Sequence, residues 1–184
     1  MQIRLAADLQ IDSIVDGKGI RTVIWTQGCG HHCPGCHNFE TQSFTDGDLI
    51  DVEDIKAEIK ELEGQDGVTF SGGDPFYQPE ACAYLAKYIH SLGMNVWCYT
   101  GFTYEQLIES KNKHVKEFLD EIDILVDGPF IKEQKSLEIK FRGSRNQNII
   151  DVKKSLETGK KVIIDMDNDS SKNKFGRNNK NMYI

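Results

Sequence analysis

Residues 21–38 read RTVIWTQGCGHHCPGCHN, an apolar and β-branched run that leads into a glycine-rich loop with three cysteines. The first part, 21–27, has the composition of a buried strand, and Gly28 ends it. The loop then places Cys29, Cys33 and Cys36 at the spacing C-x3-C-x2-C. This stretch therefore predicts a strand that delivers three soft metal ligands to its carboxyl end.

Short β-rich runs and helical patterns alternate along the rest of the chain, which is typical of a parallel α/β sheet. Apolar residues recur every three or four positions in the helical stretches, and Thr103 with Gln106 forms a capping-box pattern. We expect strands over 21–27, 67–70, 94–99, 122–126, 137–141 and 161–164, and helices over 52–62, 79–92, 103–119 and 152–157. The sequence thus predicts an α/β domain with parallel strands.

Four unusual turns follow the ends of these expected strands. They are the cysteine loop 28–38, the turn Ser71-Gly72-Gly73-Asp74-Pro75, the pair Thr100-Gly101 and the turn Asp127-Gly128-Pro129. The carboxyl ends of parallel strands lie on one edge of a sheet, where ligands bind. We therefore expect the four turns to converge on one site.

Length and charge limit the possible functions. A chain of 184 residues suffices for one domain with its own core, expected over 1–165, and the polar end 166–184 is expected to be flexible. The net charge of −7 argues against nucleic acid as the main partner. The sequence has no apolar run long enough to span a membrane, and residues 1–10 lack the apolar block of a signal peptide. The expected location is the cytoplasm, with no membrane partner.

The cysteines indicate a metal site. There are five, and in a reducing compartment the three in the loop are typical of metal ligands, while Cys82 and Cys98 fit the core. Three thiolates on a compact loop suit a 4Fe-4S cluster with one iron left open for a substrate. The alternative is a structural zinc ion with His31, His32 or His37 as fourth ligand. Zinc ligands usually come as two pairs from separate segments, so this single loop favours iron–sulfur.

The cysteine loop resembles that of the radical S-adenosylmethionine superfamily, and Gly72-Gly73-Asp74 resembles the substrate-binding turn of that superfamily. A narrower resemblance is to the family of activating proteins of anaerobic ribonucleoside-triphosphate reductase. It rests on Asp16-Gly17-Lys18-Gly19-Ile20-Arg21, Gln27-Gly28-Cys29, His32-Cys33-Pro34-Gly35-Cys36-His37-Asn38, the turn 71–75, Asp127-Gly128-Pro129-Phe130, and Arg142-Gly143-Ser144 with Asn146-Gln147. The fold that the resemblance implies is a partial (open) parallel β/α barrel of the radical S-adenosylmethionine type.

The resemblance also implies roles for individual residues. Cys29, Cys33 and Cys36 would hold the 4Fe-4S cluster on which catalysis depends, and the open iron would bind S-adenosylmethionine. Gly72 and Gly73 would let the backbone approach its methionine moiety, since no Cβ intervenes. Further cofactor contacts are implied for Gly35, Cys36 and His37 beside the adenine, Asp74 or a nearby carbonyl at the ammonium group, and Thr100, Asp127 and Arg142.

Two of these assignments have ordinary alternatives. Asp127 lies in a common turn sequence, and Arg142 can simply pair with a surface carboxylate.

The implied activity is that of a glycyl-radical-enzyme activase. Reductive cleavage of S-adenosylmethionine would give a 5′-deoxyadenosyl radical that takes hydrogen from a glycine of the catalytic subunit of anaerobic ribonucleoside-triphosphate reductase. A flavodoxin or ferredoxin would supply the electron. The alternatives are activation of another glycyl radical enzyme, modification of a small molecule, or a zinc-binding module that docks a partner.

Overall fold

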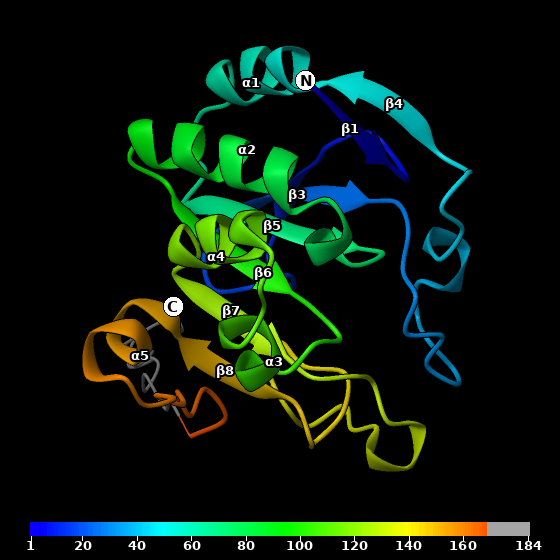
Figure 1. Cartoon of the computed structure of the whole chain (residues 1–184), viewed down its shortest axis with the longest axis vertical. Coiled ribbons are helices and arrows are strands. Elements are labelled where there is room, and N and C mark those ends of the chain that lie inside the picture. Colours follow the sequence, from blue (N-terminus) through cyan, green and yellow to red (C-terminus); the bar gives the residue numbers. More distant parts are fainter. Residues whose placement is uncertain (169–184) are drawn as a thin grey trace, which may run out of the picture.

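An open mixed sheet runs through the molecule, as the computed structural model of residues 1–168 shows (Figure 1). In these residues the strand order is β4-β1-β3-β5-β6-β7-β8, and β2 also pairs with β3. The strands are β1 (Gln2–Leu5), β2 (Gln10–Ser13), β3 (Arg21–Thr26), β4 (Asp48–Asp51), β5 (Gly67–Gly72), β6 (Asn95–Tyr99), β7 (Ile124–Asp127) and β8 (Asn148–Asp151).

The four central strands β3, β5, β6 and β7 are parallel. In their register Thr26 lies opposite Gly72, so the cysteine loop after β3 begins beside the glycine turn after β5. The outer strands β1, β2, β4 and β8 are antiparallel to their neighbours. An α/β fold with parallel strands is therefore confirmed, but the sheet of the described residues is open and mixed, with β4 and β8 at its ends.

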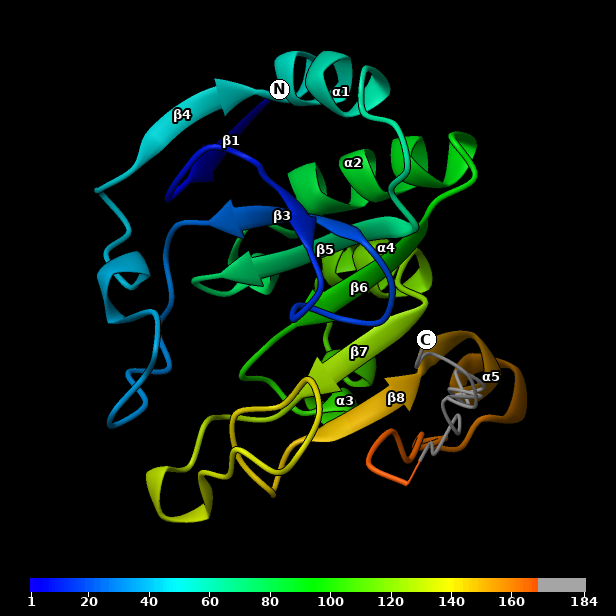
Figure 2. The ribbon, with the colours of Figure 1, turned by 180° about the vertical axis from the view of Figure 1, so that it is seen from behind.

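Helices cover one face of this sheet (Figure 1). They are α1 (Val52–Lys60), α2 (Pro79–Ser91), α3 (Tyr104–Ile108), α4 (Lys113–Asp120) and α5 (Val152–Thr158). Residues Val52, Ile55 and Ile59 of α1 are buried, as the three-and-four spacing requires. The helices and the sheet bury one large apolar core, in which Cys82 and Cys98 are completely enclosed. On the opposite face, residues 6–20 cross the central strands (Figure 2).

The structure corrects several expected elements. The single helix expected over 103–119 is two helices, because Asn112 caps a new start at α4. Residues 137–141 form no strand, and the stretch 161–164 contributes only an isolated bridge from Ile163 to Ile150. Strands β1, β2, β4 and β8 were not predicted. Each is a four-residue run in which polar and apolar residues are mixed, so it lacks the continuous apolar pattern that marks the equally short β7.

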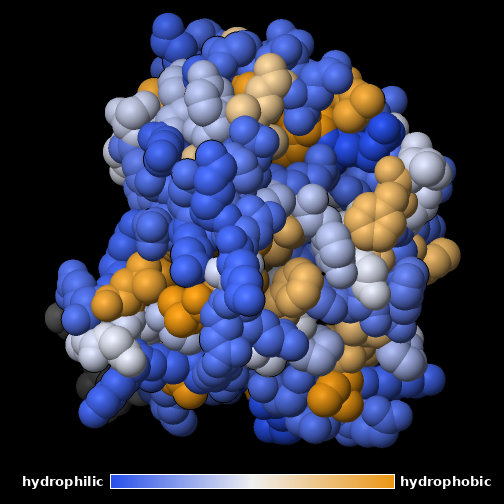
Figure 3. Space-filling view, viewed as in Figure 1, coloured by the Kyte–Doolittle hydropathy of each residue, from blue (hydrophilic) through white to orange (hydrophobic). Residues whose placement is uncertain are grey.

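The helix-covered face is largely hydrophilic, with scattered apolar side chains (Figure 3). Within residues 1–168 no helix is long and apolar enough to cross a membrane. At the chain's described end, Met166 packs against the small cluster of Trp97, Val126 and Ile149, and Asp167 pairs with Arg142. Contacts with the domain thus continue past residue 165. Most of the expected flexible tail, residues 169–184, lies outside the described residues.

Candidate functional site

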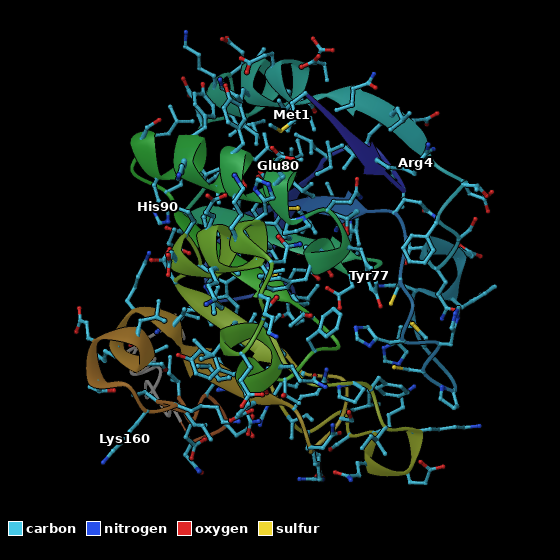
Figure 4. All side chains as sticks on the ribbon, in the orientation of Figure 1. Met1, Arg4, Tyr77, Glu80, His90 and Lys160 are labelled. Carbon is cyan, nitrogen blue, oxygen red and sulfur yellow. The ribbon has the colours of Figure 1, made fainter. Side chains whose placement is uncertain are left out.

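A cavity of about 400 Å³ opens at the carboxyl ends of the parallel strands. All four turns singled out in the sequence contribute to its wall, so their predicted convergence is confirmed. Its lining includes Cys29, His31, Cys33, Cys36, His37, Asn38, Ser71, Gly72, Gly73, Thr100, Gly101, Gly128, Phe130, Phe141, Arg142, Gly143 and Gln147. Tyr77 lies on the same side of the molecule, close to the loop that follows β3 (Figure 4).

Backbone hydrogen bonds fix the base of the cysteine loop. Gly28 N donates to Thr41 O at 2.8 Å, and Cys29 N donates to Gln42 O at 3.0 Å. Gly28 and Gly35 have φ angles of 103° and 74°, which side-chain-bearing residues rarely adopt. The glycines at these positions therefore allow the loop to turn back on itself with all three thiols on the cavity wall.

The three loop cysteines are half-buried and free of disulfides. Burial raises the pKa of Cys29 to about 11, and the carboxylate of Asp74 adds to the effect. Metal binding requires the thiolate, so coordination at Cys29 must displace a strongly held proton. A bound metal ion offsets the cost of burying the thiolate charge, because the positive charge of the metal takes the place of the proton.

The remaining two cysteines take no part in this wall. Cys82 and Cys98 are fully buried, and their thiols donate to the carbonyls of Pro75 and Tyr99. Burial raises the pKa of both thiols well above the usual value. The prediction that they belong to the core is confirmed, so the three loop thiols are the candidate cluster ligands among the five cysteines of the chain.

No group of three or more His, Cys, Asp or Glu side chains within residues 1–168 is arranged to hold a single metal ion. Ligands of a 4Fe-4S cluster need not meet at one point, because each thiolate binds a different iron. The soft donor set, the shared cavity and the absence of a fourth thiol in the wall fit a cluster with one open iron.

The glycine turn after β5 packs directly on the cysteine loop. A Cβ added at Gly73 would lie 2.5 Å from Gly28 O, and one added at Gly72 would lie 2.5 Å from Thr26 O. Asn38 Nδ2 donates to Gly72 O at 3.4 Å. Both glycines line the cavity, so backbone atoms form this part of its wall, as expected for a close approach to a ligand.

Asp74 is placed differently from the sequence expectation. Its side chain is 1% exposed, and the residue is not part of the cavity lining. The carboxylate accepts hydrogen bonds from Phe76 N, Thr100 Oγ1, Gly101 N and His31 Nε2. Thr100 and Gly101 line the cavity, whereas Asp74, which accepts their hydrogen bonds, lies beneath them and does not face the cavity.

Asp127 also lies behind the wall. It is 1% exposed, and its carboxylate accepts from Tyr104 N at 2.9 Å and from Asn148 Nδ2 at 2.8 Å. These bonds join the end of β7 to the start of α3 and to β8. The structure therefore gives Asp127 protein partners, and contact with a cofactor stays an expectation for it.

Arg142 reaches the cavity and also has a carboxylate partner. Its Nη2 pairs with Asp167, and its Nη1 donates to Gln147 O at 3.3 Å. Its Nε is buried without a hydrogen-bond partner in the described structure. A buried N–H without an acceptor is costly, so this donor is available to an anionic group of a ligand.

The expected adenine contacts Gly35 and His37 have an aromatic neighbour that the sequence analysis missed. His37 packs against Phe130, with 5.0 Å between ring centroids, and both line the cavity. The cavity also includes Trp25 and Tyr99, which lie at the carboxyl ends of β3 and β6. Strand alternation could have revealed these, because Trp25 lies directly opposite Ser71. Phe130 lies in an irregular loop and gave no such signal.

Comparisons with known proteins agree with this site. A family model described as a 4Fe-4S single cluster domain matches residues 15–150. The anaerobic ribonucleoside-triphosphate reductase-activating protein of Haemophilus influenzae is 33% identical over 149 residues, which are 74% of this chain and 90% of that protein. The protein of the same name from Vibrio cholerae is 35% identical over 144 residues, with the same two coverages. Among solved structures, QueE from Escherichia coli matches at a TM-score of 0.44 and 19% identity, over 56% of this chain and 54% of its own.

The cavity, its three free thiols and the matching family model define a protein with a single 4Fe-4S cluster domain. Identity to the two relatives is above 30% over nine-tenths of their length. The chain belongs to the family of anaerobic ribonucleoside-triphosphate reductase-activating proteins.

Proposed function

We propose that this protein is a radical S-adenosylmethionine activase that generates a glycyl radical on the catalytic subunit of anaerobic ribonucleoside-triphosphate reductase. The observation that carries the proposal is the cavity at the strand ends, which collects three free thiols and the glycine turn in one wall. Cys29, Cys33 and Cys36 would hold the cluster, which when reduced would supply the electron for cleavage of S-adenosylmethionine to methionine and a 5′-deoxyadenosyl radical; the hydrogen atom of the target glycine would pass to that radical. The names of the relatives support the choice of the reductase as target.

The protein's own residues hold and shield the reactants. Cys29, Cys33 and Cys36 supply three ligands and leave one iron for the cofactor. Gly72 and Gly73 line the cavity with backbone atoms alone, which gives the methionine moiety a close approach. A side chain at either position would collide with the backbone of Thr26 or Gly28, so the turn also needs glycine in order to pack on the cysteine loop. The four turns surround the reactants on one side, and a site that limits the access of water protects a radical from side reactions.

Wall residues also match the adenine and the carboxylate of the cofactor. His37, with Phe130 beside it, offers a flat and partly apolar surface for the adenine. Gly35 lies near Phe130 but is not among the residues that line the cavity. Arg142 offers its unpartnered Nε to the carboxylate of the methionine moiety. Thr100 lines the cavity, and its hydroxyl donates to Asp74, so that hydroxyl proton is not offered to the cofactor.

The remaining parts of the proposal concern the setting of the reaction. The parallel strands β3, β5, β6 and β7 would form the barrel-like half that surrounds the cofactor. We place the reaction in the cytoplasm, where thiols stay reduced, with a flavodoxin or ferredoxin as electron donor.

The test is anaerobic. The protein is purified without oxygen, reconstituted with iron and sulfide, reduced, and mixed with S-adenosylmethionine and the reductase catalytic subunit. We expect about four iron and four sulfide per chain, and a glycine-centred electron paramagnetic resonance signal on the reductase. Cys36→Ala should abolish both, whereas the matched variant Cys82→Ala should keep both.

Two results would contradict the proposal. A colourless protein with stoichiometric zinc would make the loop a structural zinc site. A fully loaded, reduced cluster that cleaves the cofactor yet leaves no signal on the reductase, while a small molecule is turned over, would move the activity to another target.

A further inference from the structure

We infer that Asp74 is a positioning residue, which holds the cysteine loop in place through His31 and does not itself bind the cofactor. This inference rests on the proposed function, because it assumes that the loop binds a cluster. It assigns Asp74, the acid of the glycine turn, a role that is exerted through protein contacts. The observation that motivates it is that every oxygen of this buried carboxylate is already occupied by donors from three separate segments.

The donors to Asp74 come from its own turn, from the end of β6 and from the cysteine loop. Oδ1 accepts from Phe76 N at 3.0 Å and from Thr100 Oγ1 at 3.0 Å. Oδ2 accepts from Gly101 N at 2.9 Å and from His31 Nε2 at 2.7 Å. Thr100 Oγ1 also lies 2.8 Å from Oδ2. A carboxylate has roughly four lone-pair sites, so these donors leave no free site for an ammonium group.

His31 carries this anchor into the cysteine loop. It lies two residues after Cys29 and two before Cys33, and its side chain is 17% exposed. The ring packs edge-on against Phe102, with centroids 4.5 Å apart, and against Tyr77 at 5.9 Å. The carboxylate requires the proton to be on Nε2, so Asp74 also fixes the tautomer of the ring.

Without this bond the loop has few other restraints beyond its base. Backbone bonds hold Gly28 and Cys29, and Cys36 N donates to Cys33 O at 3.1 Å within the loop. Asn38 Nδ2 reaches Gly72 O at 3.4 Å, and His32 reaches Gln42 only through an exposed contact of 3.1 Å. Ligands of a metal centre must be held by neighbours that orient them, and such supporting groups affect metal retention about 10- to 100-fold. The His31–Asp74 bond is a part-buried, short restraint of 2.7 Å within the stretch that joins the first two ligands.

The test measures cluster loss in the absence of S-adenosylmethionine, so that a direct contact with the cofactor cannot affect it. The reconstituted protein is exposed anaerobically to a chelator, and the decay of cluster absorbance is followed. The variants are His31→Phe, which keeps a ring and removes the donor, Asp74→Ala, and the double variant. His31→Gln, whose Nε2 can still donate, is the conservative rescue. His114→Gln alters a distant histidine that pairs with Glu117 and serves as the control.

We expect each single variant to lose the cluster about tenfold faster, and the double variant to lose it no faster than either single one. His31→Gln should restore much of the retention, and His114→Gln should match the unchanged protein. The electron paramagnetic resonance line shape of the reduced cluster should broaden in His31→Phe and sharpen again in His31→Gln.

Additive effects of the two single variants, or unchanged cluster loss in His31→Phe, would overturn the inference. So would an Asp74→Ala protein with normal cluster retention and weakened cofactor binding, because that pattern defines a direct ligand. If Asp74→Ala does not fold, the comparison of His31→Phe with His31→Gln decides alone. Failure of the proposed function would appear separately, as a stable cluster in the unchanged protein that never produces a glycyl radical.

Discussion

The guanidinium of Arg21 lies over the ring of Trp97, with its Cζ 5.3 Å from the ring centroid. Arg21 is completely buried at the start of β3, and it donates to Thr69 Oγ1, Asn95 Oδ1 and Val68 O at 2.6 to 2.8 Å. Burial lowers its pKa to about 10, so the side chain stays charged at neutral pH. A single arginine thereby ties the amino ends of β3, β5 and β6 together, opposite the end that forms the cavity.

Replacement of Arg21 by lysine should therefore destabilise the fold. A lysine ammonium cannot reach all three acceptors from one atom, and it loses the stacked contact with the ring. We expect Arg21→Lys to lower the free energy of unfolding by about 3 kcal/mol, and the melting temperature by roughly 6–12 °C. Thermal denaturation of the cluster-free protein, followed by circular dichroism, checks this. The exposed control Arg145→Lys should stay within about 0.5 kcal/mol, and equal melting points for the two variants would contradict the role of Arg21.

At the carboxyl end of the sheet, Gly101 lies directly against the ring of His31. A Cβ added there would lie 2.5 Å from Cδ2 of His31. Because Asp74 and Phe102 hold that ring, it cannot move aside without releasing the cysteine loop. We expect Gly101→Ala to fold and yet to retain less than about a fifth of the iron after reconstitution and desalting.

The control for this variant is Gly93→Ala. Gly93 has a φ of 80° and nothing within 4 Å of an added Cβ, so alanine there costs about 1 kcal/mol of stability from backbone strain and should leave the iron content unchanged. Iron loss in both variants would mean that stability, and not the contact with His31, controls cluster retention.

Elements with a long or distinctive pattern could be predicted from the sequence. β3, β5, β6 and β7 are largely buried runs rich in apolar, aromatic or β-branched residues, and the helices α1 and α2 have regular apolar stripes. The outer strands could not be predicted, because β4 and β8 are short and owe their existence to pairing with β1 and β7. The stretch 137–141 alternates like a strand but finds no partner there, and Leu137 is 93% exposed. Tertiary pairing decides such segments.

The positions of the site residues could be predicted from the sequence more reliably than their hydrogen-bond partners. Turns at the ends of parallel strands must meet, so the cysteine loop and the glycine turn could be brought together in advance. An acidic side chain in a turn can face either a ligand or the protein interior. Which of the two it faces depends on whether backbone amides of the protein are placed to donate hydrogen bonds to it. Asp74 and Asp127 face protein donors, and only the structure shows this. The position of Phe130 depends on a loop without regular structure and is set by packing alone.

The raised pKa of Cys29 predicts how its thiol reacts before the cluster is bound. A thiol with a pKa of about 11 is almost entirely protonated at pH 8, and only the thiolate is nucleophilic. In the cluster-free protein, alkylation of Cys29 by iodoacetamide at pH 8 should be at least about 50-fold slower than in the unfolded chain, and it should accelerate as the pH rises toward 11. Quenched samples analysed by tandem mass spectrometry locate the label. Rapid alkylation of Cys29 at pH 7 in the folded protein would contradict the raised pKa of this half-buried thiol.

The last prediction concerns the unpartnered Nε of Arg142. If this donor binds the carboxylate of S-adenosylmethionine, a lysine cannot replace it, because its single ammonium would stay with Asp167. We expect Arg142→Lys to weaken cofactor binding about tenfold, measured by equilibrium dialysis with the reconstituted and oxidised cluster, while the iron content stays normal. Arg145→Lys, three residues away and exposed, is the matched control and should bind as the unchanged protein does. Equal affinity in both variants would leave Arg142 with a purely structural role, joining Asp167 to the loop that closes the cavity.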